Sequence, residues 1–248
     1  MKSIHRRMLV GLLLTGTGLA AQATRAPAER PFGVGERAEY QVRLAGLSVG
    51  RGAIEVLGLQ EIAGHPVYHT RMTLSGGVPL AHVDDRFESW IDTVGLFSRR
   101  FHQNQREVRY RRNRTYDFNP EAGTWRRENG ETGKLTSNRP LDDLSFLFYA
   151  RTLPLEVGAT YTLRQYFKES GNPVVLRVIR KDTVRVPAGT FRTIVVRPVI
   201  QTRGLFGEGG QAEVHFSDDD RRILVMISSR VPVVGSLSLH LRSYQPPR

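Results

Sequence analysis

Apolar and polar side chains alternate with a period of two along most of this chain, and this alternation restricts the fold more than any other feature. Over residues 37–45 it places four apolar side chains on one face: Ala38, Tyr40, Val42 and Leu44. Similar alternation occurs in residues 52–59, 67–74, 82–92, 108–118, 160–167, 174–181, 190–200, 211–217, 222–230 and 236–243. Strands with one apolar and one polar face are typical of an antiparallel sheet with one face in water. We therefore expect an all-β fold with a large antiparallel sheet.

Residues 141–151 depart from the alternation and are predicted to form the one helix of the domain. Leu144 and Phe148 have helical spacing, and Asp142 and Asp143 lie near the start, where they suit the helix dipole. An 11-residue helix cannot cover a sheet of about a dozen strands. The sheet must therefore curl into a half-barrel or barrel, bind something apolar, or pair with another protein.

The chain also shows signs of an internal duplication. Short motifs recur in the same order at offsets of 123, 125 and 126 residues: Val34-Gly35 as Val157-Gly158, Ala63-Gly64 as Ala188-Gly189, and Trp90-Ile91-Asp92 as Phe216-Ser217-Asp218. Two repeats, residues 32–128 and 154–244, would then be joined through the helix. The alternative is that β-meanders reuse the same turn residues.

The N-terminus has the order of a secretory signal peptide. A basic start is followed by an apolar run over residues 8–20 and a small-residue cleavage signal that ends at Ala23. We therefore expect residues 1–23 to be a signal peptide, residues 24–31 a disordered lead-in, and residues 32–246 a single domain. The mature protein should be exported, periplasmic and soluble. The chain contains no cysteine, which excludes thiol catalysis and cysteine zinc sites.

Several short motifs together resemble the exported bacterial family called domain of unknown function 3108, or DUF3108. They are Phe32-Gly-Val-Gly-Glu-Arg-Ala-Glu-Tyr40, Asp143-Leu-Ser145, Arg151-Thr-Leu-Pro-Leu155 with Gly158, Val184-Arg-Val-Pro-Ala-Gly-Thr-Phe191, and Phe216-Ser-Asp218 followed by Arg222. The resemblance implies a β-rich envelope protein. Its fold is similar to the half-barrels of periplasmic lipoprotein carriers, which hold acyl chains on a concave face under a helical lid. The resemblance supplies no catalytic residues.

The main functional hypothesis is a non-enzymatic protein that binds a lipid or another amphiphile on the concave sheet face, with the helix as a lid. The side chains expected to line the ligand are Tyr40, Trp90, Leu144, Phe148, Tyr161 and Phe216. The alternative is a structural or assembly protein that contacts other envelope proteins. The two hypotheses differ in the interior, since a cavity favours binding and a filled core favours assembly.

Arginines dominate the basic residues, and many of them lie in residues 99–114. This run could contact an anionic membrane surface, and the candidate residues are Arg109, Arg111, Arg112 and Arg114. The competing interpretation is a solvated strand that is protected by charge. Nucleic acid is not expected as a partner, because export removes most contact with it.

Catalytic and metal-binding interpretations are weak. Gly46-Leu-Ser48-Val-Gly50 matches the nucleophile elbow of serine hydrolases, but that elbow needs a helix after the serine, and strand-like alternation follows here. A serine hydrolase that uses Ser48 is therefore only a remote alternative. The pair His65 and His69 and the group around His82 lack the further ligands of a metal site. We expect no cofactor and no metal.

Overall fold

The computed structural model describes residues 30–78, 81–107, 110–199, 212–231 and 235–248. Within them the chain forms one 14-stranded antiparallel sheet and one α-helix, α1. The elements are β1 (Arg37–Leu44), β2 (Leu47–Ile62), β3 (His65–Val78), β4 (Ala81–Asp92), β5 (Ser98–Glu107), β6 (Tyr110–Asn119), β7 (Thr124–Arg127), β8 (Thr132–Lys134), α1 (Ser145–Arg151), β9 (Thr160–Leu163), a 3₁₀ turn (Glu169–Gly171), β10 (Val174–Val186), β11 (Gly189–Val199), β12 (Glu213–Ser217), β13 (Leu224–Val231) and β14 (Gly235–Gln245).

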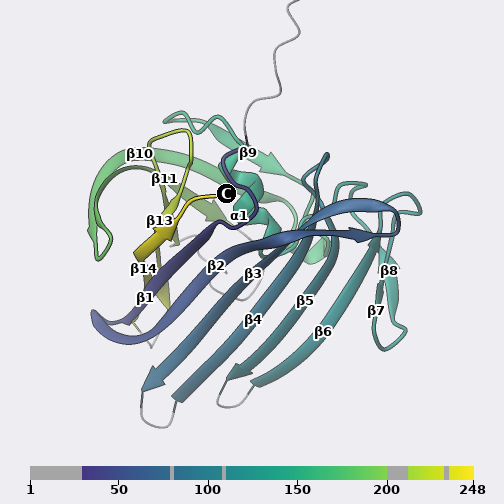
Figure 1. The fold of residues 1–248 in the computed structure, drawn as a ribbon. Helices are drawn as coiled ribbons and strands as arrows, with labels where there is room; N and C mark the ends of the chain where they lie inside the picture. Colours follow the sequence, from purple (N-terminus) through teal and green to yellow (C-terminus); the bar gives the residue numbers. More distant parts are fainter. Residues whose placement is uncertain (1–29, 79–80, 108–109, 200–211, 232–234) are drawn as a thin grey trace, which may run out of the picture.

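The first and last strands of the chain pair with each other in the interior of the sheet. The strand order is β8-β7-β6-β5-β4-β3-β2-β1-β14-β13-β12-β11-β10-β9, so β8 and β9 are the two edges and the sheet does not close. Figure 1 shows the two halves of the sheet curling toward each other around α1. The predicted fold, a curled antiparallel sheet with one central helix, is confirmed.

The strand register shows which side chains share the concave face. One row of directly paired residues crosses seven strands: Leu241, Tyr40, Gly52, Leu74, Asp85, Gln105 and Arg112. The adjacent concave row contains Ala38, Ile54, Met72, Phe87, Gln103 and Arg114. Directly paired residues project to the same face. Both rows therefore begin apolar at β1 and end polar on β5 and β6.

Glycines allow two neighbouring strands to approach each other closely at one point on this face. Gly50 of β2 pairs with Gly76 of β3, and a Cβ atom on Gly76 would lie only 2.5 Å from the Cα atom of Gly50. Gly76 also has a φ of 152°. Glycine at such a position is typical of a bend at a barrel corner.

Helix α1 fills one end of the concave face. Six of its seven residues are buried, and the Phe148 ring packs edge-on against Phe32 with 5.0 Å between ring centroids. The helix begins at Ser145, four residues later than predicted, because residues 141–144 form its cap and a bridge between Leu141 and Tyr166. A lid would keep one face in solvent. The prediction of a lid is therefore wrong, and α1 is a plug inside the sheet.

The two halves of the chain share local geometry at matching positions. The Gly35 amide donates to the Val56 carbonyl oxygen at 2.9 Å, and the Gly158 amide donates to the Val178 carbonyl oxygen at 2.8 Å. A register shift follows each acceptor, in β2 and in β10. These equivalences are what a duplication of the strand–turn–strand unit predicts. Among the described residues, no helix has the length and apolar character needed to cross a bilayer.

Candidate functional site

The concave face is only partly covered by α1. Where the helix packs, apolar side chains are buried, but toward the turn between β1 and β2 they are only half-buried. The half-buried concave side chains there include Val42, Leu44, Leu74 and Phe87. These residues form an apolar wall with no element of the described chain packed over it completely.

An apolar pocket lies between α1 and strands β10 to β12, and we call it the α1 pocket. Its lining consists of Asp143, Phe146, Leu147, Ala150, Tyr166, Leu176, Val196, Pro198, Val214 and Phe216. The space free of protein atoms is about 490 Å³ including its open mouth, and about 40 Å³ is open to the centre of a water molecule. One water needs roughly 10–15 Å³ on the second scale. The α1 pocket therefore has room for part of an alkyl chain.

A polar wall faces this apolar region from the other half of the sheet. It is formed by Asp85, Gln103, Gln105, Arg112 and Arg114 on β4 to β6. The Gln103 side chain is 1% exposed, and its Oε1 accepts a hydrogen bond of 3.4 Å from Arg112. Asp85 is also buried, and it accepts a 3.0 Å bond from the Arg106 amide.

Asp143 and Tyr166 connect the α1 pocket with the polar wall. The Tyr166 hydroxyl donates to Asp143 Oδ1 at 2.8 Å. The Asp143 side chain is open to solvent in the concavity but has protein around its other sides, and this desolvation raises its pKa. The hydrogen bond from Tyr166 and the charges of Lys168 and Arg112 oppose that rise. The concavity therefore places a carboxylate and two basic side chains, Lys168 and Arg112, beside an apolar pocket.

The residue before Asp143 fixes α1 to the sheet. Asp142 is fully buried, and its Oδ2 accepts hydrogen bonds of 2.6 Å from the hydroxyls of Ser89 and Ser98. Its Oδ1 accepts bonds of 2.8 Å from the amides of Leu144 and Ser145. This carboxyl group thus caps the helix and ties it to β4 and β5.

Burial raises the pKa of Asp142 to about 6, although the serine hydroxyls and backbone amides oppose the rise. The folded protein therefore keeps a proton between about pH 4 and 6 that the unfolded chain has lost, so this contribution to stability is full below about pH 4 and is lost by about pH 7. As the pH rises from about 4 to 7, we expect the free energy of unfolding of the parent to fall by about 3 kcal/mol relative to that of Asp142→Asn. Urea unfolding of both proteins at each pH measures it. A difference that stays constant with pH would contradict the prediction.

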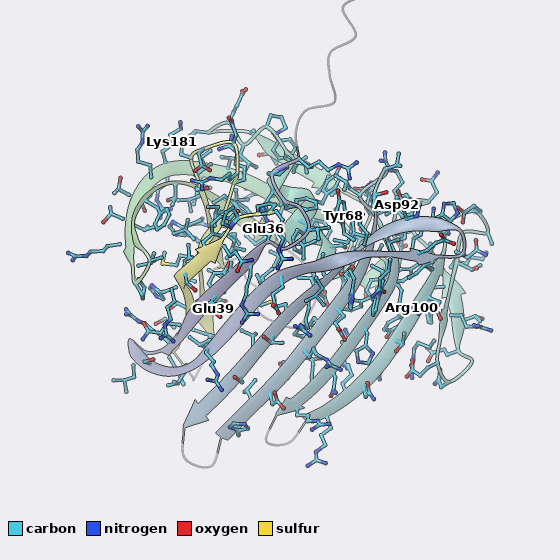
Figure 2. The ribbon with its side chains drawn as sticks, in the orientation of Figure 1. Glu36, Glu39, Tyr68, Asp92, Arg100 and Lys181 are labelled. Atoms are coloured by element: carbon cyan, nitrogen blue, oxygen red, sulfur yellow. The ribbon has the colours of Figure 1, made fainter. Side chains whose placement is uncertain are left out.

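A second buried contact holds the other end of α1. Arg151 forms two hydrogen bonds with Glu36, of 2.7 and 3.2 Å, and donates to the carbonyl oxygen of Arg221 at 2.9 Å. Both charged side chains are about 6–7% exposed. Figure 2 places Glu36 beside α1, near the middle of the molecule. The Tyr244 hydroxyl donates to the same carboxylate at 3.1 Å.

Three of the six predicted lining residues lie at cavities. Phe216 lines the α1 pocket. Tyr40 and Phe148 line a smaller space beside Glu36 and Arg151, of which about 20 Å³ is open to the centre of a water molecule. The Tyr40 hydroxyl donates to the Leu224 carbonyl oxygen at 2.9 Å, so this side chain is tied into the core.

The other three predicted lining residues lie elsewhere. Leu144 is 1% exposed in the core, and Tyr161 lies on the edge strand β9, where its hydroxyl donates to the Pro154 carbonyl oxygen. Trp90 is on the convex face, stacked on His69 with 4.5 Å between ring centroids, because its neighbours in β4 occupy the concave face. The expectation that Trp90 lines the ligand is therefore wrong.

The predicted arginines are divided between the two faces of β6. Arg112 and Arg114 belong to the concave rows, whereas Arg111 pairs with Arg106 on the opposite face. Near the ends of β5 and β6, however, Arg106, Arg111 and Arg112 line one open space. Arg109 lies outside the described residues. Contact of these arginines with an anionic surface therefore stays a prediction.

Neither the predicted serine nor the histidine groups form a recognisable reaction centre. Ser48 lies near the start of β2 directly after a two-residue turn, and its hydroxyl accepts a 3.1 Å hydrogen bond from Gln41. In the described part of the chain, no three histidine or acidic side chains gather as a metal site would require.

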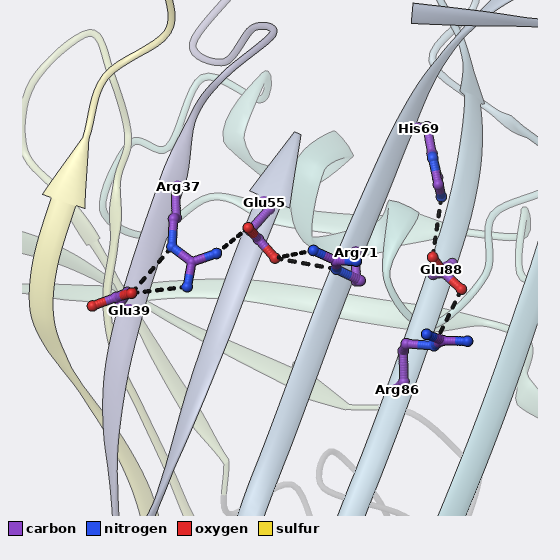
Figure 3. Close-up of polar contacts among 7 residues, drawn as sticks. All are labelled: Arg37, Glu39, Glu55, His69, Arg71, Arg86 and Glu88. Carbon is purple, nitrogen blue, oxygen red and sulfur yellow. Dashed lines mark hydrogen bonds and ion pairs between the residues drawn. The ribbon is translucent and has the colours of Figure 1, made fainter. Parts of the chain in front are cut away.

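Charges on the convex face of β1 to β4 neutralise one another. Figure 3 shows two groups of ion pairs. One contains Glu39, Arg37, Glu55 and Arg71, and the other contains His69, Glu88 and Arg86. The Glu55 carboxylate lies between two arginines, with 3.0 Å to Arg71. Three arginines of these strands, Arg37, Arg71 and Arg86, are therefore already paired with acids.

A family model described as "Protein of unknown function (DUF3108)" matches residues 39–242, which is most of the chain. The chain belongs to the DUF3108 family. The match spans β1 to β14, and therefore includes both halves of the sheet and α1. No curated protein is similar enough to this DUF3108 chain to be matched by sequence.

Three solved structures are similar to this DUF3108 chain to different degrees. A β-barrel-like protein of DUF1849 from Brucella abortus is 12% identical, with a TM-score of 0.51 over 86% of this chain and 98% of that one. A protein described as exported, with a YmcC-like fold, from Bacteroides fragilis has 10% identity, a TM-score of 0.32 and coverages of 87% and 98%. A protein described as a lipoprotein from Parabacteroides distasonis has 9% identity, a TM-score of 0.34 and coverages of 89% and 100%. The first likeness supports the barrel-like fold.

Proposed function

We propose that this DUF3108 protein is a non-enzymatic, exported envelope protein that binds a lipid or another amphiphile in the concavity of its sheet. The observation that carries the proposal is the α1 pocket, in which eight of the ten lining residues are apolar. Ligand pockets are mostly apolar with a few polar groups, and here Asp143 and Tyr166 are those polar groups.

The incomplete cover of the concave face supports the same function. Helix α1 has only seven residues, and it packs against one end of the concavity. Val42, Leu74 and Phe87 remain half-buried beyond it. Moving apolar surface out of water contributes about 25 cal/mol per Å², so an alkyl chain laid on this wall would be stabilised.

The proposed location rests on the N-terminal pattern. The basic start, apolar run and Ala21-Gln22-Ala23 site have the order of a signal peptide, and export would place the mature protein in the periplasm. There the concavity would meet membrane-derived amphiphiles. The non-enzymatic role is part of the proposal, supported by the position of Ser48 in a hairpin strand.

Native mass spectrometry of the mature protein, purified from the envelope without detergent, tests the proposal. We expect an adduct that organic solvent extracts as a lipid. Ala150→Leu should lower its occupancy at least about tenfold, because Ala150 lines the α1 pocket and a larger side chain would fill it. Leu144 and Phe148 are unsuitable for this test, since neither lines the α1 pocket.

Ala122→Leu is the matched control, because Ala122 is exposed in the turn between β6 and β7. Its adduct should equal that of the parent, and both variants should keep the parent's melting temperature within a few degrees. A protein without adduct that also fails to bind added fatty acid would contradict the proposal. The assembly role would then be preferred, and crosslinking in the envelope would identify partners.

A further inference from the structure

We infer that the amphiphile in the concavity carries an anionic headgroup, which Arg112 and Arg114 of the polar wall bind while the alkyl chain enters the α1 pocket. This inference rests on the proposed function and specifies the chemistry of its ligand.

The two arginines project from the concave face of β6. Arg114 pairs with Gln103, which is 1% exposed, and Arg112 pairs with Gln105. Arg112 also donates to Gln103 across the face. A headgroup there would meet guanidinium groups on a wall with reduced access to water, where charge-assisted hydrogen bonds are stronger.

The concave rows bring positive charge to β6. Arg112 and Arg114 both project from the concave face of this strand. Arg112 donates a hydrogen bond to the Gln103 side chain and has a further contact besides it. Two guanidinium groups thus lie at the end of the rows where the apolar wall stops.

A third cation lies near the α1 pocket. The Lys168 ammonium group lies 4.8 Å from the Phe167 ring centroid and 5.2 Å from that of Tyr116. Two acids face the three basic groups, and each is already bonded: Asp143 to the Tyr166 hydroxyl and Asp85 to a backbone amide. The three positive charges outnumber the two negative charges, so the local charge balance favours an anionic ligand over a cationic one.

The position of Asp143 gives the ligand an orientation. Asp143 lines the α1 pocket, and the charge of Arg112 acts on its carboxylate, so the pocket and the polar wall adjoin. An amphiphile with its chain against Phe146 and Phe216 would place its headgroup on the side of β5 and β6. The apolar and basic parts of the concavity thus match the two ends of one molecule.

Three probes with the same 12-carbon chain test this inference: laurate, dodecyltrimethylammonium and dodecyl maltoside. Each is titrated below its critical micelle concentration, and calorimetry gives its affinity for the mature protein. We expect laurate to bind at least about tenfold more tightly than the other two. Arg112→Gln and Arg114→Gln, singly and together, should reduce that preference, with the double variant close to none.

Arg111→Gln is the matched control, because Arg111 lies on the same strand but on the convex face. Its preference for laurate should equal that of the parent. Should the concave variants unfold, the salt dependence of the parent decides instead, since only laurate affinity should fall as sodium chloride rises. Equal binding of all three probes would overturn the inference and leave the proposed function standing. Binding of none would contradict the proposed function itself.

Discussion

Asp142→Ala is expected to lower the free energy of unfolding at pH 5 by about 3–5 kcal/mol, because it leaves several buried donors without an acceptor. The carboxyl group accepts from two serine hydroxyls and two backbone amides, and no water reaches this fully buried group. The loss would detach the start of α1 from β4 and β5. Urea unfolding followed by circular dichroism measures the effect.

The neighbouring residue provides the control for this prediction. Asp143 has the same side chain, but it is open to the concavity and makes one side-chain hydrogen bond, to Tyr166. Asp143→Ala should cost only about 1 kcal/mol. Equal costs for the two variants would show that Asp142 does not hold the helix in place.

The second large effect is expected at the other end of α1. Arg151→Met should lower the free energy of unfolding by about 3–5 kcal/mol, because it leaves the Glu36 carboxylate buried without its cation. Glu36 and Arg151 are joined by two hydrogen bonds and are among the least exposed charged groups of the structure. The same unfolding experiment, carried out at pH 7, measures the effect.

Two further variants distinguish a buried charge from a simple loss of contact. Adding Glu36→Leu to Arg151→Met should recover most of the loss, since no unpaired charge remains. Arg100→Met removes a pair with Asp117 in which both side chains are about 40% exposed, and it should cost less than about 1 kcal/mol. A double variant less stable than Arg151→Met alone would overturn the explanation.

Much of the fold could be predicted because a period of two records which face of a strand is buried. The alternation around Tyr40 and around Leu239 and Leu241 indicated one apolar face, and these residues meet in the sheet as β1 and β14. The helix was visible because Leu144 and Phe148 break that period. Turn residues such as Ala63 and Gly64 indicated where strands reverse, and both have positive φ values.

The site was harder to predict, because alternation does not state whether an aromatic side chain faces the apolar or the polar side. Trp90 was expected inside, but Ser89 and Ile91 occupy the concave face and direct it outward. A serine in an apolar row is a weak signal, yet Ser89 binds Asp142. The useful signal was present at the helix ends, where Asp142 and Arg151 are charged residues within an apolar segment.

Arg112 and Arg114 could have been separated from Arg111 by the alternation alone. They share parity with Tyr116 and Phe118, which are buried in the core. Treating the arginines as one basic patch ignored that parity. Their distance from α1 along the sheet, by contrast, depends on pairings between strands and could not be read from one segment.

The pairing of β1 with β14 has a consequence for how this protein is made. The two strands are separated by about 190 residues of chain, so the pairing cannot form until the C-terminal strand has been synthesised. Contacts between residues so distant in sequence are slow to form. Until then, one side of β1 is an unpaired edge able to accept a strand from another chain, which is a hazard for aggregation. Biogenesis of this fold therefore depends on its final strand, and the first strand needs protection until that strand arrives.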